Sequence, residues 1–277
     1  MAGVGIMSEH IDLAVSDTFA PGFYYQELHQ RYAGSIYGQY HATQLPRFSQ
    51  NYGYDPDQMI GDLGDDVHPV RHMAYTEASV AVPFITTQLT SSHEHFNRQQ
   101  IIGLRLAAIL HDIGESQHPA ITEAVGVTVG DVWFESKQTS DAQQEFLIRH
   151  FLYGQLYADI PPVLLEQAEE AIENGDCFSG LAFNTIERLG YYKTAVKAGE
   201  LALKLRLSRE EREEPSRRFT NLARLALRVS DNHRTILQER AELFPHADWV
   251  LRFNARRYER IHSVLPDFVQ QAAGQTT

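Results

Sequence analysis

The sequence predicts an all-α protein, and three observations lead to this fold class. Amphipathic stretches of helical length follow one another from residue 67 almost to the C-terminus. Proline and glycine mark the ends of such stretches, as in PPVLLEQAEEAIENG (161–175), which begins with two prolines and ends with a glycine. Only short β-branched stretches such as VGVTV (125–129) have the composition of a strand.

The N-terminal half contains three expected helical stretches. One helix is expected over about 21–40, and the rest of the Tyr- and Gly-rich residues 1–66 is expected to form loops packed on a core, because so many aromatic residues make disorder unfavourable. The stretch 70–89 is amphipathic, with a kink or break at Pro83. The stretch 95–114 ends in a glycine, a common helix stop.

The C-terminal half continues the series. Ser140 is a suitable N-cap for a helix over 140–157. The charge-dense stretch 208–218 predicts an exposed turn between two later helices. Further helices are expected over 161–175, 181–207, 218–244 and 247–268.

Composition and charge limit the classes of function. The 277 residues include 24 Lys and Arg against 36 Asp and Glu, a formal net charge of −12. This balance argues against binding to nucleic acid polymers or anionic membranes, but a small phosphorylated molecule needs only two or three local cations. The single cysteine, Cys177, excludes an internal disulfide and fits a reducing compartment. Without a signal-like start or an apolar run of membrane length, a soluble, cytoplasmic protein is expected.

One stretch, LAAILHDIGE (106–115), carries the chemistry. A continuous apolar run predicts burial, yet it leads directly into His111 and Asp112. A buried carboxylate and a buried imidazole cost several kcal/mol unless something compensates them, and a divalent cation satisfies both. On a continuing helix Glu115 would lie over the same patch, and Gly114 would allow a close approach. The alternative is a helix that simply ends here, with Asp112 in solvent.

A second histidine strengthens the metal interpretation. His72 precedes the His-Asp pair by a wide interval and stands on an amphipathic helix of its own. Together with His111, Asp112 and a later carboxylate on a third helix, it would make a site of four ligands.

His72 followed by His111-Asp112, with Glu115 next along the same segment, resembles the HD superfamily of metal-dependent phosphohydrolases. Within it, the sequence is similar to the branch that contains the 5′-deoxynucleotidases, over roughly residues 45–200. The resemblance implies an HD-type helical bundle with one divalent metal ion and release of phosphate from a nucleoside 5′-monophosphate. Mn, Co, Fe, Zn and Mg are all compatible with mixed nitrogen and oxygen ligands.

The organisation of the sequence also predicts a division into three parts. Residues 67–200 would form the HD-type catalytic domain, 1–66 an N-terminal extension packed on it, and 201–277 a C-terminal helical extension. A homodimer formed through the C-terminal helices is a further hypothesis.

The resemblance assigns roles to further residues. Glu115 would orient or deprotonate the attacking water, and Asp131 would protonate the leaving 5′-oxygen, although that assignment requires an insertion after HDIGE. Arg47 and Lys137 would hold the phosphate. The last metal ligand, an Asp in the family, corresponds by spacing and surroundings to Glu187 in FNTIERLGYYKTA.

Several alternatives stay open at this point. Asp176 and Asp231 compete with Glu187 for the last ligand position. His118 or His150 would support a second metal ion, which would favour a phosphodiesterase or a triphosphohydrolase of the same superfamily. The Glu in place of Asp and the displaced Gly-Asp also fit a degenerate HD domain that senses a nucleotide without cleaving it.

Overall fold

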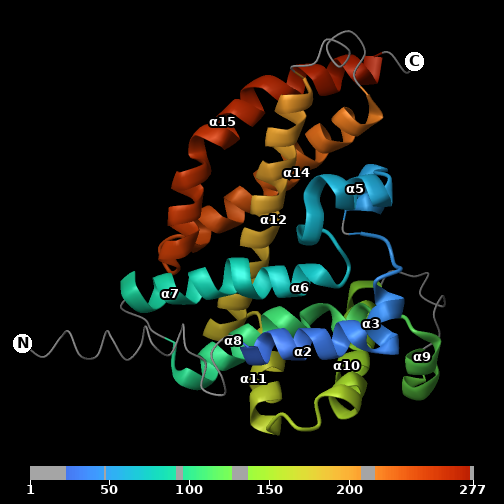
Figure 1. The fold of residues 1–277 in the computed structure, drawn as a ribbon. Helices are drawn as coiled ribbons and strands as arrows, with labels where there is room; N and C mark the ends of the chain where they lie inside the picture. The colour runs from blue at the N-terminus through green and yellow to red at the C-terminus, as the bar shows by residue number, and fades with distance from the viewer. Residues whose placement is uncertain (1–22, 47, 92–95, 127–136, 207–215, 275–277) are drawn as a thin grey trace, which may run out of the picture. The chain divides into compact units, whose positions relative to one another are not determined.

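Helices make up the regular structure of the described part of the chain. The computed structural model describes residues 23–46, 48–91, 96–126, 137–206 and 216–274, and every regular element within these ranges is a helix (Figure 1). The all-α prediction is therefore confirmed for them. Residues 127–129 of the VGVTV stretch and most of the turn expected over 208–218 lie outside the described ranges.

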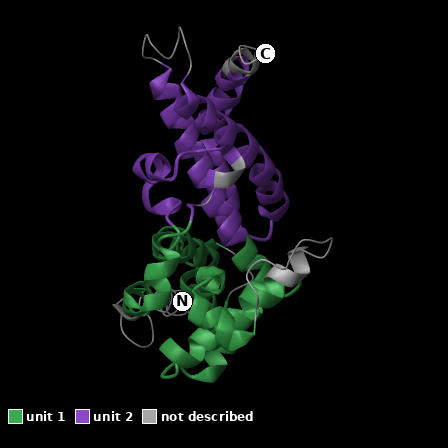
Figure 2. Cartoon of the chain, turned by 90° about the vertical axis from the view of Figure 1, so that its right-hand side faces the viewer, with its two compact units in different colours: residues 1–44, 69–184 green, residues 45–68, 185–277 purple. Residues whose placement is uncertain are grey.

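The chain divides into two compact units (Figure 2). The first unit comprises Met1–Gln44 and Pro69–Asn184, and the second comprises Leu45–His68 and Thr185–Thr277. These bounds differ from the division into 1–66, 67–200 and 201–277, which stays a prediction about domains. Among the described residues, no helix combines the length and the apolar composition that crossing a membrane requires.

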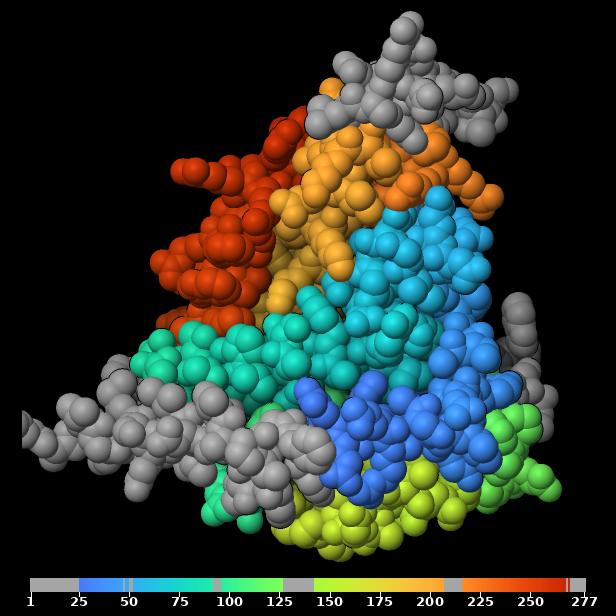
Figure 3. All heavy atoms as spheres, viewed as in Figure 1, coloured from blue at the N-terminus to red at the C-terminus, as the bar shows by residue number. Residues whose placement is uncertain are grey.

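The first unit is built around α8 (Arg98–Leu110). Every residue of α8 from Ile101 to Leu110 is buried, because other helices cover it on all sides. On the face drawn in Figure 3, atoms of α2 and α3 lie between those of α6 and those of α10 and α11. The remaining elements of this unit are α2 (Phe23–Gly34), α3 (Ile36–His41), α6 (Arg71–Thr76), η2 (Glu77–Ala81), α7 (Val82–Ser91), η3 (His111–Glu115), α9 (Pro119–Val125), α10 (Lys137–Leu156), α11 (Pro162–Glu173) and the start of α12 (Phe178–Leu205).

Three expected boundaries in this unit need correction. The helix expected over 21–40 is interrupted at Ser35, whose hydroxyl accepts a hydrogen bond from the Gly38 amide and so caps α3. At Pro83 the chain stays helical, and the irregularity is the π-helical turn η2 just before it, since proline provides no amide hydrogen for the regular ladder. Helix α10 already begins at Lys137, so Ser140 lies inside it.

The second unit contains the C-terminal helices and a segment expected to be loop. Its elements are α4 (Ser49–Tyr52), α5 (Pro56–Leu63), η1 (Gly64–Asp66), the rest of α12, α14 (Arg217–Arg240) and α15 (Pro245–Gly274). The expectation of loops here was wrong: Asp55 accepts a hydrogen bond from the Gln58 amide, and Pro56 occupies the first turn of α5. The carboxylate of Asp62 then pairs with Arg218 and holds α5 to α14.

Candidate metal centre

The segment HDIGE changes helix type where its chemistry begins. Helix α8 ends at Leu110, and His111–Glu115 form the 3-10 helix η3 instead of continuing the α-helix that we expected. With about three residues per turn, Asp112 and Glu115 share one face and His111 does not share it. Only 4% of His111 and 7% of Asp112 is exposed, whereas Glu115 is exposed. The alternative in which Asp112 points into solvent is therefore excluded.

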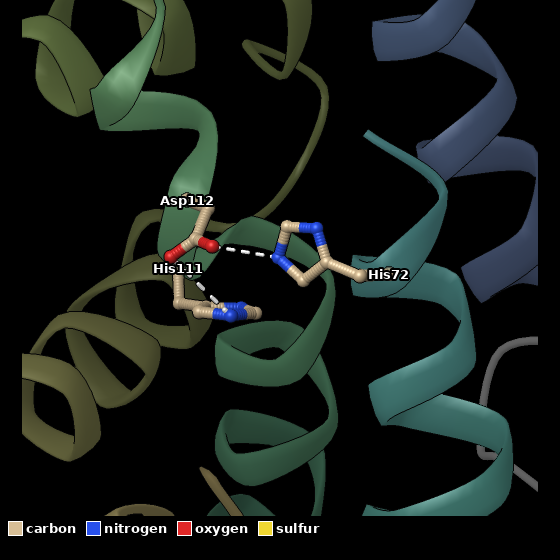
Figure 4. A group of neighbouring side chains, drawn as sticks. All are labelled: His72, His111 and Asp112. Atoms are coloured by element: carbon tan, nitrogen blue, oxygen red, sulfur yellow. Dashed lines mark ion pairs between the residues drawn. The ribbon is translucent and has the colours of Figure 1, made fainter. Parts of the chain in front are cut away.

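Three predicted metal ligands come together in the first unit. His72 on α6 is 1% exposed, and its Nε2 lies 2.6 Å from Oδ2 of Asp112. Nε2 of His111 lies 3.3 Å from Oδ1 of the same carboxylate (Figure 4). The two imidazole rings meet edge to face, with centroids 5.4 Å apart. One nitrogen or oxygen atom from each residue lies within 4.8 Å of the others, a spacing that can hold one metal ion.

A backbone contact fixes the tautomer of His111. Its Nδ1 lies 3.1 Å from the carbonyl oxygen of Ala108. A carbonyl oxygen only accepts, so Nδ1 carries the proton and donates it, and the lone pair of the neutral ring is left on Nε2, on the side of Asp112. The ring of Phe183 packs against the same imidazole at 5.6 Å. Metal-binding histidines are commonly oriented by such a second hydrogen bond.

The donor set fits a divalent cation. A buried carboxylate between two imidazoles is compensated either by a proton on one ring or by a cation that all three groups bind. Two imidazole nitrogens and one carboxylate oxygen are ligands that Zn, Mn, Fe and Co accept. Three protein ligands also leave coordination positions open, as catalytic metal sites require.

A buried ion pair links the elements that carry these ligands. Arg105 on α8 donates from Nε to Oε1 of Glu77 on η2 at 2.7 Å, and the side chains are 5% and 8% exposed. The guanidinium also lies over the ring of Tyr25, 3.7 Å from its centroid. Glu77 follows His72 on the same helical run, so the pair fixes the histidine's helix against α8.

A second buried arginine supports η3 from the other side. Arg149 on α10 is 1% exposed, and its Nη1 lies 3.5 Å from the backbone carbonyl of His111. Its Nε donates to Glu169 on α11 at 3.0 Å, and Glu173 contacts the same guanidinium. Burial lowers the pKa of Arg149, but the charge and hydrogen bond of Glu169, together with Tyr153 and Glu173, outweigh burial, so the net pKa lies above the usual value. The arginine therefore stays charged.

The phenol of Tyr32 lies near the carboxylates of Asp112 and Glu115. Burial raises the pKa of Tyr32 on α2, the Ser116 hydroxyl lowers it, and the negative charges of Asp112 and Glu115 raise it further. The Tyr32 hydroxyl is 2.8 Å from Nδ1 of His41, and Ser116 donates to the Tyr37 carbonyl at 3.2 Å. Helices α2 and α3 therefore border η3.

Glycine at position 114 is required by a backbone contact, as the sequence suggested. A Cβ atom there would lie 2.6 Å from the carbonyl oxygen of Glu145 on α10. The close neighbour is thus a helix, and the glycine lets α10 pack directly on the turn that carries His111 and Asp112.

The three candidates for the last metal ligand lie on or next to later helices. Glu187 stands on α12 within the second unit, so its role as the last ligand stays a prediction. Asp176 is exposed in the turn before α12, and Asp231 on α14 accepts a hydrogen bond from the Tyr258 hydroxyl at 2.8 Å.

The remaining predicted residues have mixed outcomes. His118 caps α9 and contacts aromatic rings, and His150 is exposed; neither belongs to the described group of metal-binding residues. Lys137 begins α10, while Arg47 and Asp131 lie outside the described residues.

Sequence reasoning missed the supporting residues Glu77, Arg105 and Arg149. A signal was present for the arginines, since each interrupts an apolar run, IIGLRLAAIL and FLIRHFLY. A charge inside a buried stretch requires a partner. The identity of that partner depends on how the helices pack.

Comparisons of this chain with models of known protein families, with curated proteins and with solved structures give no match.

Proposed function

We propose that the protein is a metal-dependent phosphohydrolase that releases phosphate from a nucleotide, with nucleoside 5′-monophosphates as the substrate class. The observation that carries the proposal is the convergence of the buried side chains of His72, His111 and Asp112 on one point, with the tautomer of His111 fixed. The resemblance of the same residues to the HD superfamily supports the choice of reaction, and it supports an HD-type bundle within a cytoplasmic protein.

Each residue has a chemical task in this proposal. A divalent cation held by His72, His111, Asp112 and, as proposed last ligand, Glu187 would neutralise phosphate charge and lower the pKa of bound water. Glu115 is exposed on the face of η3 that Asp112 shares, where a carboxylate can orient a water molecule and accept its proton.

The other three predicted residues would act on the substrate. Asp131 would donate a proton to the leaving 5′-oxygen. Arg47 and Lys137 would bind the phosphate oxygens through charge-assisted hydrogen bonds.

Turnover on a panel of phosphate esters tests the proposal. The protein is stripped with a chelator, restored with Mn, Co, Fe, Zn or Mg, and supplied with nucleoside monophosphates, nucleoside triphosphates and a cyclic dinucleotide. We expect phosphate release from monophosphates, only in the restored protein. Cleavage of the triphosphate or the dinucleotide alone would replace the proposal by a triphosphohydrolase or a phosphodiesterase. Tight nucleotide binding without turnover would make the protein a sensor.

Two acid variants separate the proposed roles. Glu115→Ala and Asp131→Ala should keep the metal ion and lose turnover by ~10²–10⁴, the usual size of a general acid or base contribution. With nitrophenyl phosphate, whose leaving group needs no proton, the Asp131→Ala defect should shrink and the Glu115→Ala defect should persist. Glu123→Ala, which removes an exposed carboxylate on the neighbouring helix α9, is the matched control and should be as active as the unaltered protein. Losses below about threefold on both substrates for Asp131→Ala would remove Asp131 from the site and leave the acid unidentified.

A further inference from the structure

A hollow of about 340 Å³ lies between α12 and α15 within the second unit. The two helices come into close contact at Gly199, where a Cβ atom would collide with the side chain of the buried Ile261. The residues that line the hollow are Glu200, Leu203 and Lys204 from α12 and Arg256, Arg257 and Arg260 from α15.

The lining concentrates positive charge. Four cationic side chains face one carboxylate, a balance of +3 (4 − 1), in a chain whose formal net charge is −12. Nε of Arg257 lies 3.0 Å from Oε1 of Glu200, so that carboxylate is already paired. Within the described ranges, the side chains of Lys204, Arg256 and Arg260 make no hydrogen bond or ion pair. Like charges that line one hollow repel one another, and an anion bound among them would relieve that repulsion.

The shape and the chemistry favour a small polyphosphate. Arginine guanidinium groups bind phosphate oxygens with two parallel hydrogen bonds, and a balance of three positive charges among the described lining residues matches the charge of a di- or triphosphate better than that of a single phosphate group. The volume suits a small molecule, and Leu203, 8% exposed, provides an apolar wall.

Exposed aromatic rings lie next to the cations on the same helix. Phe253 is 59% exposed and Trp249 51% exposed, and their rings stack with centroids 5.2 Å apart. The guanidinium of Arg257 lies 5.0 Å from the centroid of the Phe253 ring, so the aromatic face adjoins the hollow. From Phe253 to Arg260 the helix rises ~10 Å, at about 1.5 Å per residue. At that distance a base whose phosphates contact the arginines can stack on Phe253 in place of the Arg257 guanidinium, which lies over that ring.

We infer that this face of the second unit binds a nucleoside di- or triphosphate, with its phosphates in the hollow of Lys204, Arg256 and Arg260 and its base on Phe253. The residues that line this hollow belong to the second unit and the His72, His111 and Asp112 group belongs to the first, and the inference does not rest on the proposed hydrolysis.

Binding measurements on the full-length chain test the inference. Isothermal titration with ATP, tripolyphosphate and inorganic phosphate is performed in the presence of EDTA, which removes divalent ions and prevents turnover. We expect ATP to bind most tightly, tripolyphosphate next and phosphate weakest, with affinities that fall as salt is raised. Asp112→Ala should bind ATP as the unaltered chain does, because it alters only the other site.

Single substitutions locate the ligand. Arg256→Gln and Arg260→Gln should each weaken ATP binding at least tenfold, and Arg224→Gln, an exposed arginine on α14, should leave it unchanged. Phe253→Ala should weaken ATP but leave tripolyphosphate unaffected. The substituted side chains are all exposed, namely those of Arg224, Phe253, Arg256 and Arg260. The fold should therefore be kept, which circular dichroism checks.

Three results would overturn the inference. The first is unchanged ATP affinity in Arg256→Gln and Arg260→Gln. The second is loss of ATP binding in Asp112→Ala, which would place the nucleotide at the metal centre. The third is tighter binding of a single-stranded oligonucleotide than of ATP through the same arginines, which would assign the face to a polymer.

Discussion

Nε2 of His72 lies 2.6 Å from Oδ2 of Asp112, although the two residues belong to helical segments that are well separated in the sequence. The side chains meet because α6 and α8 pack against each other, and the ion pair between Glu77 and Arg105 fixes that packing. The geometry of the candidate metal centre therefore depends on buried charges that do not themselves contact a metal ion.

Removing one partner of the Glu77–Arg105 pair should destabilise the protein, whereas removing both partners should not. Arg105→Met leaves a buried carboxylate without its cation and should lower the free energy of unfolding by about 3–5 kcal/mol. The double variant Glu77→Leu with Arg105→Met should recover most of that loss, since it buries no charge. Urea unfolding measures both values. A loss below about 1 kcal/mol in the single variant would contradict a structural role for the pair.

Gly114 should tolerate no side chain. Gly114→Ala forces its Cβ against the Glu145 carbonyl and must move η3 or α10, so both unfolding free energy and metal affinity should fall. Gly103→Ala is the control, because a Cβ there would lie 2.9 Å from Gln167 on α11, in an equally close helix contact away from the ligands. It should lower stability but leave metal affinity as it was. Equal metal affinity in the two variants would show that the contact at Gly114 does not position His111 and Asp112.

Much of the candidate metal centre can be predicted from the sequence. The features that cannot be predicted from it have a physical reason. The apolar run before His111 predicts burial, and burial of an imidazole beside a carboxylate predicts a compensating partner. The change from α-helix to 3-10 helix at His111 is not encoded by a proline or a cap residue. It results from the packing of η3 against α10, where Gly114 meets the backbone of Glu145 from a different part of the chain.

Other differences between the predicted and the observed structure also arise from contacts between residues that are far apart in the sequence. The Tyr- and Gly-rich composition of 49–66 masked the helix signal of Asp55 and Pro56, and α5 is held by a pair with Arg218 from far along the chain. The partners of Arg105 and Arg149 depend on which helices become neighbours. Helical periodicity does not specify those neighbours.

The last metal ligand can be identified by conservative substitutions. If Glu187 binds the metal ion, Glu187→Gln should lower metal affinity by at least about tenfold, since the amide has lost the negative charge. Asp176→Asn and Asp231→Asn, which change exposed carboxylates in the same way, should leave the affinity unchanged. Competition with a fluorescent chelator measures all three. Loss of the metal ion in Asp231→Asn alone would assign the ligand to α14.

The second unit should lose stability on mild acidification. Burial, with the charge of Arg188 as a smaller contribution, lowers the pKa of His233 to about 4, and burial with the charge of Lys193 lowers the pKa of His246 to about 4. Both lie below the unfolded value of about 6.5, so the unfolded chain binds more protons between these pH values. The stabilisation is complete above about pH 6.5 and is lost as the pH falls towards 4.

Urea unfolding at pH 7.5 and pH 5 checks this dependence. His246→Phe keeps a flat ring against Trp249, which stacks on His246 at 5.6 Å, but it cannot be protonated. The variant should lose less stability between the two pH values than the unaltered chain. An identical loss in both proteins would show that His246 does not contribute.

The metal content of the purified chain tests the central claim most directly. We expect elemental analysis by mass spectrometry to find about one divalent ion per chain, none in His111→Ala or Asp112→Ala, and an unchanged content in His150→Ala, which removes an exposed histidine. If the unaltered chain carries no metal ion and binds none of Mn, Co, Fe, Zn or Mg on titration, the buried carboxylate is compensated by a proton on His72 or His111, and the metal centre proposed here does not exist.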